Sequence, residues 1–97
     1  MEKMFYLNEL FDLYGELLTS KQQKYFKDYY FNNLSYGEIG EKYGISRNAI
    51  FHQLKLIEEK LEFYEEKLNL LVQKQKINDI IDLVEDKKIK DMLNDLL

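Results

Sequence analysis

Apolar residues recur at intervals of three and four along most of the chain, which is the spacing of helices with one buried face. The first such run covers residues 4–18 and includes one glycine, Gly15, which weakens a helix slightly. Its apolar positions are Leu7, Leu10, Phe11, Tyr14, Leu17 and Leu18. The pattern predicts an amphipathic helix that packs against a core.

A second helix is predicted to begin at Thr19, because Gln22 follows three residues later and the pair can form a capping box. Asn32 and Asn33 end it. Its aromatic side chains are Tyr25, Phe26, Tyr29, Tyr30 and Phe31. Such rings can stack on nucleic-acid bases, but the helical spacing favours a core, where aromatic side chains bury large areas. The lysines on its other side either contact a DNA backbone or form a solvated face: Lys21, Lys24 and Lys27.

Residues 34–57 have the pattern of a helix-turn-helix. Ser35 and Glu38 form another capping box before a short helix. Gly40 permits a close approach of two helices, and Gly44 suits the left-handed end of the first one. Ser46 can cap the helix that follows. A motif of this kind places its second helix in the DNA major groove.

The second helix of this motif has an apolar face and a polar face. Ala49, Ile50 and Leu54 are expected to point inward. The outward face, which is the candidate nucleic-acid-binding surface, consists of Arg47, Asn48, Phe51, His52 and Lys55. Arginine can pair with guanine and asparagine with adenine, an aromatic ring can contact the thymine methyl, and Lys55 and His52 can reach phosphates. The alternative is a helical hairpin in an ordinary bundle, whose exposed residues are only solvated.

A heptad pattern continues from this helix and predicts one continuous helix over residues 47–74. The predicted dimerisation residues are Leu54, Ile57, Leu61, Tyr64, Leu68 and Leu71. The pattern has two explanations, which are pairing with a second copy and packing against the chain's own terminal helices. We expect a homodimer, because two recognition helices would then read two half-sites about one turn of DNA apart.

The heptad pattern breaks at residues 73–76, and a C-terminal helical tail is predicted over residues 77–97. Residues 85–88 are polar and are expected to form a turn within it. The apolar residues of the tail are Ile77, Ile80, Ile81, Val84, Ile89, Met92, Leu93, Leu96 and Leu97. The tail is expected to close the core, exchange between protomers or dock on a partner protein.

Composition narrows the fold class to all-α. The 97 residues contain no proline, and no glycine follows Gly44, so few helix breakers are present. The length suits one domain over residues 1–97, with a helix-turn-helix core over 18–57. The net charge is −4, yet residues 21–55 contain six basic and three acidic side chains. This footprint is weak for a DNA-binding protein, and we expect low non-specific affinity with a steep dependence on salt.

The chain offers little catalytic chemistry, and we expect no enzymatic activity, cofactor or metal. There is no cysteine, and His52 is the only histidine, so one chain cannot form a histidine-based metal site. The glycines do not form a phosphate-binding loop. No apolar run has the length of about 18 residues that a membrane span needs, and no secretory signal is present. A cytoplasmic location without membrane contact is therefore expected.

Several short motifs in residues 19–68 together resemble those of the YlxM family of small bacterial proteins, which are similar to region 4 of sigma factors. The matching words are Leu18-Thr19-x-Lys21-Gln22, Tyr29-Tyr30, Ser35-x-Gly37-Glu38-Ile39-Gly40-Glu41, Ile45-Ser46-Arg47-x-Ala49-Ile50-Phe51 and Glu65-Glu66-Lys67-Leu68. Three positions depart from the family pattern: His52 replaces an acidic residue, Phe51 a tyrosine and Leu56 a basic residue.

The resemblance implies a helix-turn-helix of the winged-helix-like superfamily without a wing, and a DNA-binding regulatory function. Genes of the family typically lie beside that of the signal recognition particle GTPase, so a role in that pathway is also implied. The alternative function is an accessory protein that does not bind DNA and contacts the signal recognition particle GTPase or its RNA.

Overall fold

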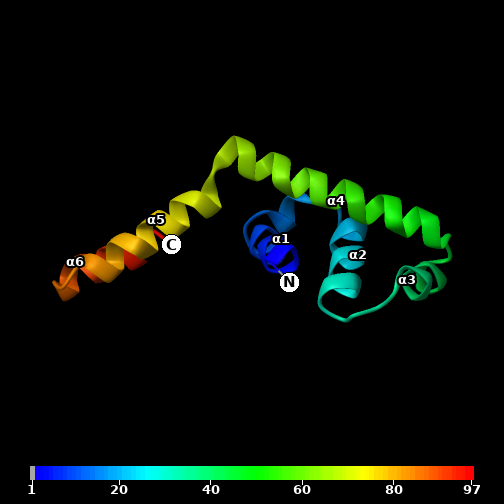
Figure 1. Cartoon of the computed structure of the whole chain (residues 1–97), viewed down its shortest axis with the longest axis horizontal. Coiled ribbons are helices and arrows are strands. Elements are labelled where there is room, and N and C mark those ends of the chain that lie inside the picture. The colour runs from blue at the N-terminus through cyan, green and yellow to red at the C-terminus, as the bar shows by residue number, and fades with distance from the viewer. Residues whose placement is uncertain (1) are drawn as a thin grey trace.

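The computed structural model describes residues 2–97, and within this range every regular element is a helix (Figure 1). The elements are α1 (Glu2–Tyr14), the 3₁₀ turn η1 (Gly15–Leu17), α2 (Ser20–Tyr30), α3 (Tyr36–Tyr43), α4 (Arg47–Leu68), α5 (Leu70–Leu83) and α6 (Lys87–Asn94). The all-α fold class is therefore confirmed. The domain predicted over 1–97 begins at Met1, which lies outside the described residues.

The hydrogen bonds at the start of α2, α3 and α4 confirm the predicted helix caps. The Thr19 hydroxyl accepts a hydrogen bond from the Gln22 amide, and the Gln22 side chain accepts one from the Thr19 amide, both at 3.1 Å. Ser35 and Glu38 form the same reciprocal pair, while the Ser46 hydroxyl accepts from the amide three residues later. These bonds satisfy free backbone N–H groups at the start of α2, α3 and α4.

The first helix is shorter than predicted, because α1 ends at Tyr14 and Gly15 begins the 3₁₀ turn. The backbone must become extended at Leu18 and Thr19 to form the capping box of α2, so the helix cannot continue through residue 18. As a result Leu18 is buried, whereas Leu17 points into solvent.

The core lies where α4 crosses α1 and α2 (Figure 1). Phe11 of α1 and Phe26 of α2 stack with ring centroids 4.2 Å apart. Tyr25 and Phe26 are buried as expected, while Tyr29 and Tyr30 are only half-buried and Phe31 is 48% exposed. The side chains that are entirely inaccessible include Leu7, Leu10, Ile39, Ile50, Ile57 and Leu61.

The prediction of one continuous helix over residues 47–74 is wrong, because α4 ends at Leu68 and the chain turns at Asn69. Asn69 has φ +55°, a left-handed conformation that asparagine tolerates better than most residues. The buried Glu65 carboxylate accepts hydrogen bonds from the amides of Leu71 and Val72, at 3.0 and 3.2 Å. The Tyr14 hydroxyl donates to the same carboxylate at 2.6 Å and accepts from the Leu70 amide. These contacts satisfy the free N–H groups at the start of α5.

Most residues of the predicted dimer seam are buried inside one chain. Leu54, Ile57 and Leu61 pack in the core with α1 and α2, and Leu71 is buried beside them. Tyr64 is half-buried, and Leu68 is 48% exposed. The structure thus favours the intramolecular explanation of the heptad pattern, which corrects the assignment of these four residues to dimerisation. The dimer itself stays a prediction and has to use other surfaces.

The C-terminal helices form a hairpin that extends away from the other helices (Figure 1). The break predicted at residues 73–76 is absent, since α5 runs through them. The turn falls at 84–86, and the Asp86 side chain caps α6 by accepting from the Ile89 amide. The molecule measures 55 × 25 × 22 Å. None of the helices described for residues 2–97 combines the length and the apolar character that crossing a membrane requires.

Candidate nucleic-acid interface

The short turn between α3 and α4 is held in a tight conformation. Gly44 has φ +71° and ends α3 in the left-handed region. A Cβ on Gly40 would lie 2.6 Å from the Ile45 carbonyl oxygen, so only glycine permits this approach. Ile39 of α3 and Ile50 of α4 are both fully buried and join the two helices. The turn therefore fixes where the first residues of α4 point.

All five predicted nucleic-acid-binding residues lie on the N-terminal half of α4, and all five are exposed. Arg47 is the first residue of the helix, and Ser46 caps it. Phe51 is 42% exposed, which is high for a large apolar side chain. Its ring contacts those of His52 and Tyr36, with centroids 5.5 and 5.6 Å away. The face thus presents cationic, amide and aromatic groups together.

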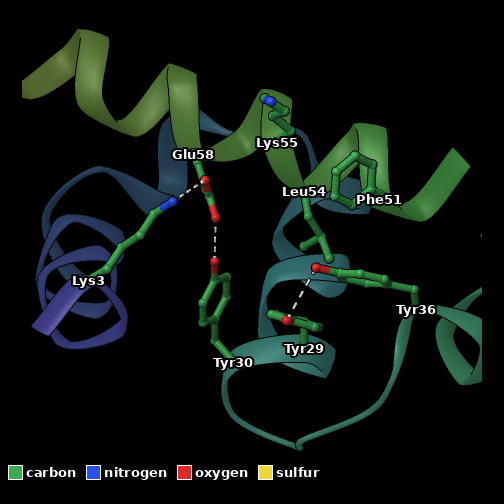
Figure 2. A pocket seen from close by; sticks show the side chains of 8 residues that line it. All are labelled: Lys3, Tyr29, Tyr30, Tyr36, Phe51, Leu54, Lys55 and Glu58. Carbon is green, nitrogen blue, oxygen red and sulfur yellow. Dashed lines mark hydrogen bonds and ion pairs between the residues drawn. The ribbon is translucent and has the colours of Figure 1, made fainter. Parts of the chain in front are cut away.

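The structure also shows a cavity of about 230 Å³ beside this face (Figure 2). Its walls come from the start of α1, the end of α2, the start of α3 and the middle of α4. The lining residues are Lys3, Tyr29, Tyr30, Tyr36, Phe51, Leu54, Lys55 and Glu58. Among these, only Phe51 and Lys55 belong to the predicted nucleic-acid-binding face, while Leu54 is one of the predicted dimerisation residues. The helical spacing predicts Tyr29 and Tyr30 as core residues, because it does not distinguish a core from a cavity wall, and no pattern in the sequence singles out Tyr36.

One wall of the cavity carries a small polar network. The Tyr30 hydroxyl donates to Glu58 Oε1 at 2.7 Å, and Lys3 Nζ lies 3.3 Å from Glu58 Oε2. Burial and the hydrogen bond to Glu58 raise the pKa of Tyr30 far above its ordinary value of 10.0. The hydroxyl therefore stays protonated and keeps donating to the carboxylate. On the other wall the Tyr29 hydroxyl donates to that of Tyr36 at 3.3 Å.

A second network, around the buried Asp28, holds α3 against α2. Its carboxylate accepts from the Tyr43 hydroxyl at 2.7 Å, and Lys42 Nζ lies 3.1 Å from both oxygens. The Asn32 side chain donates to Oδ1 at 3.2 Å. Burial alone would raise the pKa of Asp28, but the hydrogen bonds from Tyr43, Lys42 and Asn32 outweigh it and lower the pKa below 3.8. The network anchors the helix that precedes the turn.

Comparison with known proteins agrees with this architecture. Residues 1–96 match the family described as "Putative helix-turn-helix protein, YlxM / p13 like". A UPF0122 protein of Listeria innocua is 42% identical over 104 residues, which cover 98% of this chain and 94% of that protein. The UPF0122 protein YlxM of Bacillus subtilis is 51% identical over 71 residues, or 73% of this chain and 64% of that protein.

The resemblance inferred from the sequence motifs is thereby confirmed. The match extends over nearly the whole chain, beyond the residues 19–68 in which the motifs were found. The chain belongs to the UPF0122 family of YlxM- and p13-like helix-turn-helix proteins.

Proposed function

We propose that the protein is a DNA-binding regulator that reads duplex DNA with the N-terminal half of α4. The observation that carries this proposal is the exposed face formed by Arg47, Asn48, Phe51, His52 and Lys55 directly after a rigid turn. A single helix with such donors suits the major groove, which is about 12 Å wide. The local excess of basic residues in 21–55 supports the same orientation toward phosphates.

Arg47→Ala tests the proposal after a preferred duplex has been selected from a random pool. Arg47 is exposed and makes no contribution to the core, so the variant is expected to keep the helical content and stability of the parent. Loss of one good base contact costs about 1–3 kcal/mol, and specific binding is expected to weaken roughly tenfold to hundredfold. Fluorescence anisotropy with the selected duplex measures the change.

Lys76→Ala is the matched control, because it removes one exposed positive charge from α5 instead of α4. It is expected to leave the affinity almost unchanged. A specific complex that is equally tight with Arg47→Ala and Lys76→Ala would show that Arg47 does not read DNA. Failure to enrich any duplex at low salt would contradict the proposed function itself.

A second candidate function is an accessory role in the signal recognition particle pathway. It is supported by the apolar side chains that the α5–α6 hairpin exposes, among them Leu83, Met92 and Leu96. Such a surface fits a protein partner better than DNA. Titration of the protein with the purified particle GTPase, and separately with the particle RNA, tests this role. Absence of binding to both the GTPase and the RNA would contradict the accessory role.

A further inference from the structure

The cavity beside α4 has the size of one planar ring system. Its volume of about 230 Å³ is below the range of roughly 300–1,000 Å³ that holds a drug-sized ligand. Two of its lining residues, Phe51 and Lys55, also belong to the exposed face of α4 (Figure 2). A ligand in this cavity would therefore lie next to a nucleic acid that binds to that face.

One wall of the cavity is an ordered aromatic platform. The ring of Tyr36 stacks on Tyr29, with centroids 5.0 Å apart and planes within 13°. Phe51 meets the Tyr36 ring edge-on, with centroids 5.6 Å apart. Leu54 adds an aliphatic surface between these rings and the opposite wall. Rings already held in place stack on a planar ligand with little loss of conformational entropy, and protein sites for unstacked bases use this device.

The opposite wall presents a carboxylate. Glu58 is held by the Tyr30 hydroxyl on Oε1 and by Lys3 on Oε2 (Figure 2). Each carboxylate oxygen has two lone pairs, so both oxygens can accept one more hydrogen bond. A carboxylate only accepts, and this selects a ring that offers donors. Among the bases, guanine alone has two adjacent donors on its pairing edge, the N1–H and the N2 amino group.

We propose that this cavity binds one unstacked guanine base, with its plane against the Tyr36 ring, the nearly perpendicular Phe51 ring at its edge, and its pairing edge on Glu58. Lys55 also lines the cavity and is exposed, so its ammonium group is available to pair with the phosphate of the same nucleotide. The site takes a guanine from a free nucleotide or from a single-stranded segment.

This binding goes beyond the proposed reading of duplex DNA. A guanine in a duplex is stacked and its pairing edge is occupied, and extruding it costs a few kcal/mol. An unpaired guanine avoids that cost. The guanine site and the duplex-reading face share two side chains, Phe51 and Lys55, but the platform and the carboxylate lie outside the duplex-reading face.

The experiment is an NMR titration of the full chain with guanosine monophosphate and with pentathymidine carrying a central guanine, adenine or thymine. The central guanine is expected to bind at least tenfold tighter than the other two, with the largest shifts at Tyr36, Phe51 and Glu58. Similar affinity for the mononucleotide would make the free nucleotide the source, and much weaker binding would make it the single strand. Equal affinity for the three pentamers, or shifts confined to other residues, would overturn the proposal.

Glu58→Gln provides the second arm, because an amide offers one donor and one acceptor and pairs with adenine. The variant is expected to lose the guanine preference and gain affinity for the central adenine, a reversal that a general loss of structure would not produce. Glu59→Gln is the matched control, since it makes the same charge change at the neighbouring exposed position.

Retention of the guanine preference in Glu58→Gln would also overturn the proposal. A parallel titration with duplex DNA distinguishes the two hypotheses, since duplex binding can fail while the guanine preference persists.

Discussion

At the scale of single residues, the buried Asp28 carboxylate of α2 binds two side chains of α3 and one from the loop that follows α2. Tyr43, Lys42 and Asn32 all donate to it. Sequence inspection gave Asp28 no role, because an aspartate in the middle of a helix with lysines nearby resembles an ordinary surface residue. Its importance comes from α3 folding back over α2, which brings donors from 14 and 15 residues away.

Asp28→Asn is expected to lower the free energy of unfolding at pH 7 by about 1.5–3 kcal/mol, the value of hydrogen bonds to a charged group. The folded-state pKa of Asp28 is depressed, so its contribution is present above the unfolded pKa near 3.8 and disappears as the pH falls through the folded value. The difference between variant and parent should therefore shrink in acid. Urea unfolding at pH 7 and pH 3 measures it.

Asp12→Asn makes the same change at an exposed position of α1 and serves as the control. It should alter stability little at either pH. A gap between Asp28→Asn and the parent that is as large at pH 3 as at pH 7 would show that the ionised carboxylate is not the source of the stabilisation.

At the scale of elements, the turn between α3 and α4 requires glycine at position 40, which has no side chain. Gly40→Ala places a Cβ within 2.6 Å of the Ile45 backbone oxygen, and a backbone atom cannot move away as a flexible side chain can. We expect a loss of about 1–3 kcal/mol, which is typical of overpacking, together with weaker DNA binding because the turn shifts. Thermal unfolding monitored by circular dichroism gives the first value.

Gly37→Ala is the matched control on the same helix, since its Cβ would meet only Ser35 Oγ, at 3.9 Å. Alanine is a better helix former than glycine, so this change should stabilise α3 by about 0.5–1 kcal/mol. If both variants were equally stable, the close approach at Gly40 would not matter to the motif.

At the scale of the whole molecule, the hairpin of α5 and α6 exposes several large apolar side chains. Leu83 is 84% exposed and Met92 is 62% exposed. Because Leu54, Ile57, Leu61 and Leu71 of the heptad seam are buried within the chain, we predict that the dimer forms through this hairpin. The hairpin lies at the far end of the molecule from α3, so a dimer would keep the DNA-reading face free (Figure 1).

The double variant Leu83→Lys and Met92→Lys is expected to convert the dimer to a monomer, as measured by light scattering after size exclusion. Both side chains point into solvent in one chain, so the fold should persist. Leu17→Lys, at an exposed position of η1, is the control and should remain dimeric. A parent that is monomeric at every concentration would contradict the predicted dimer, and a dimeric double variant would exclude this hairpin as its interface.

The sequence by itself determined the features that depend on residues three or four positions apart. The caps at Thr19, Ser35 and Ser46 and the glycine end of α3 at Gly44 were predicted and are confirmed. The exposure of the α4 face was also expected, because the helical period places its five residues on one side. Each of these features depends only on residues that are close in sequence, within the same helix or turn.

Only the tertiary structure decided where α4 ends, what the seam buries and where the aromatic cavity lies. The break after Leu68 involves a bond between Tyr14 and Glu65, which are 51 positions apart in the chain. The cavity likewise requires Lys3, Tyr30 and Glu58 to meet from three helices. A repeating apolar pattern shows which face is buried but carries no information about the partner, because burial of apolar surface is non-directional. The partner was set when α4 packed across α1 and α2.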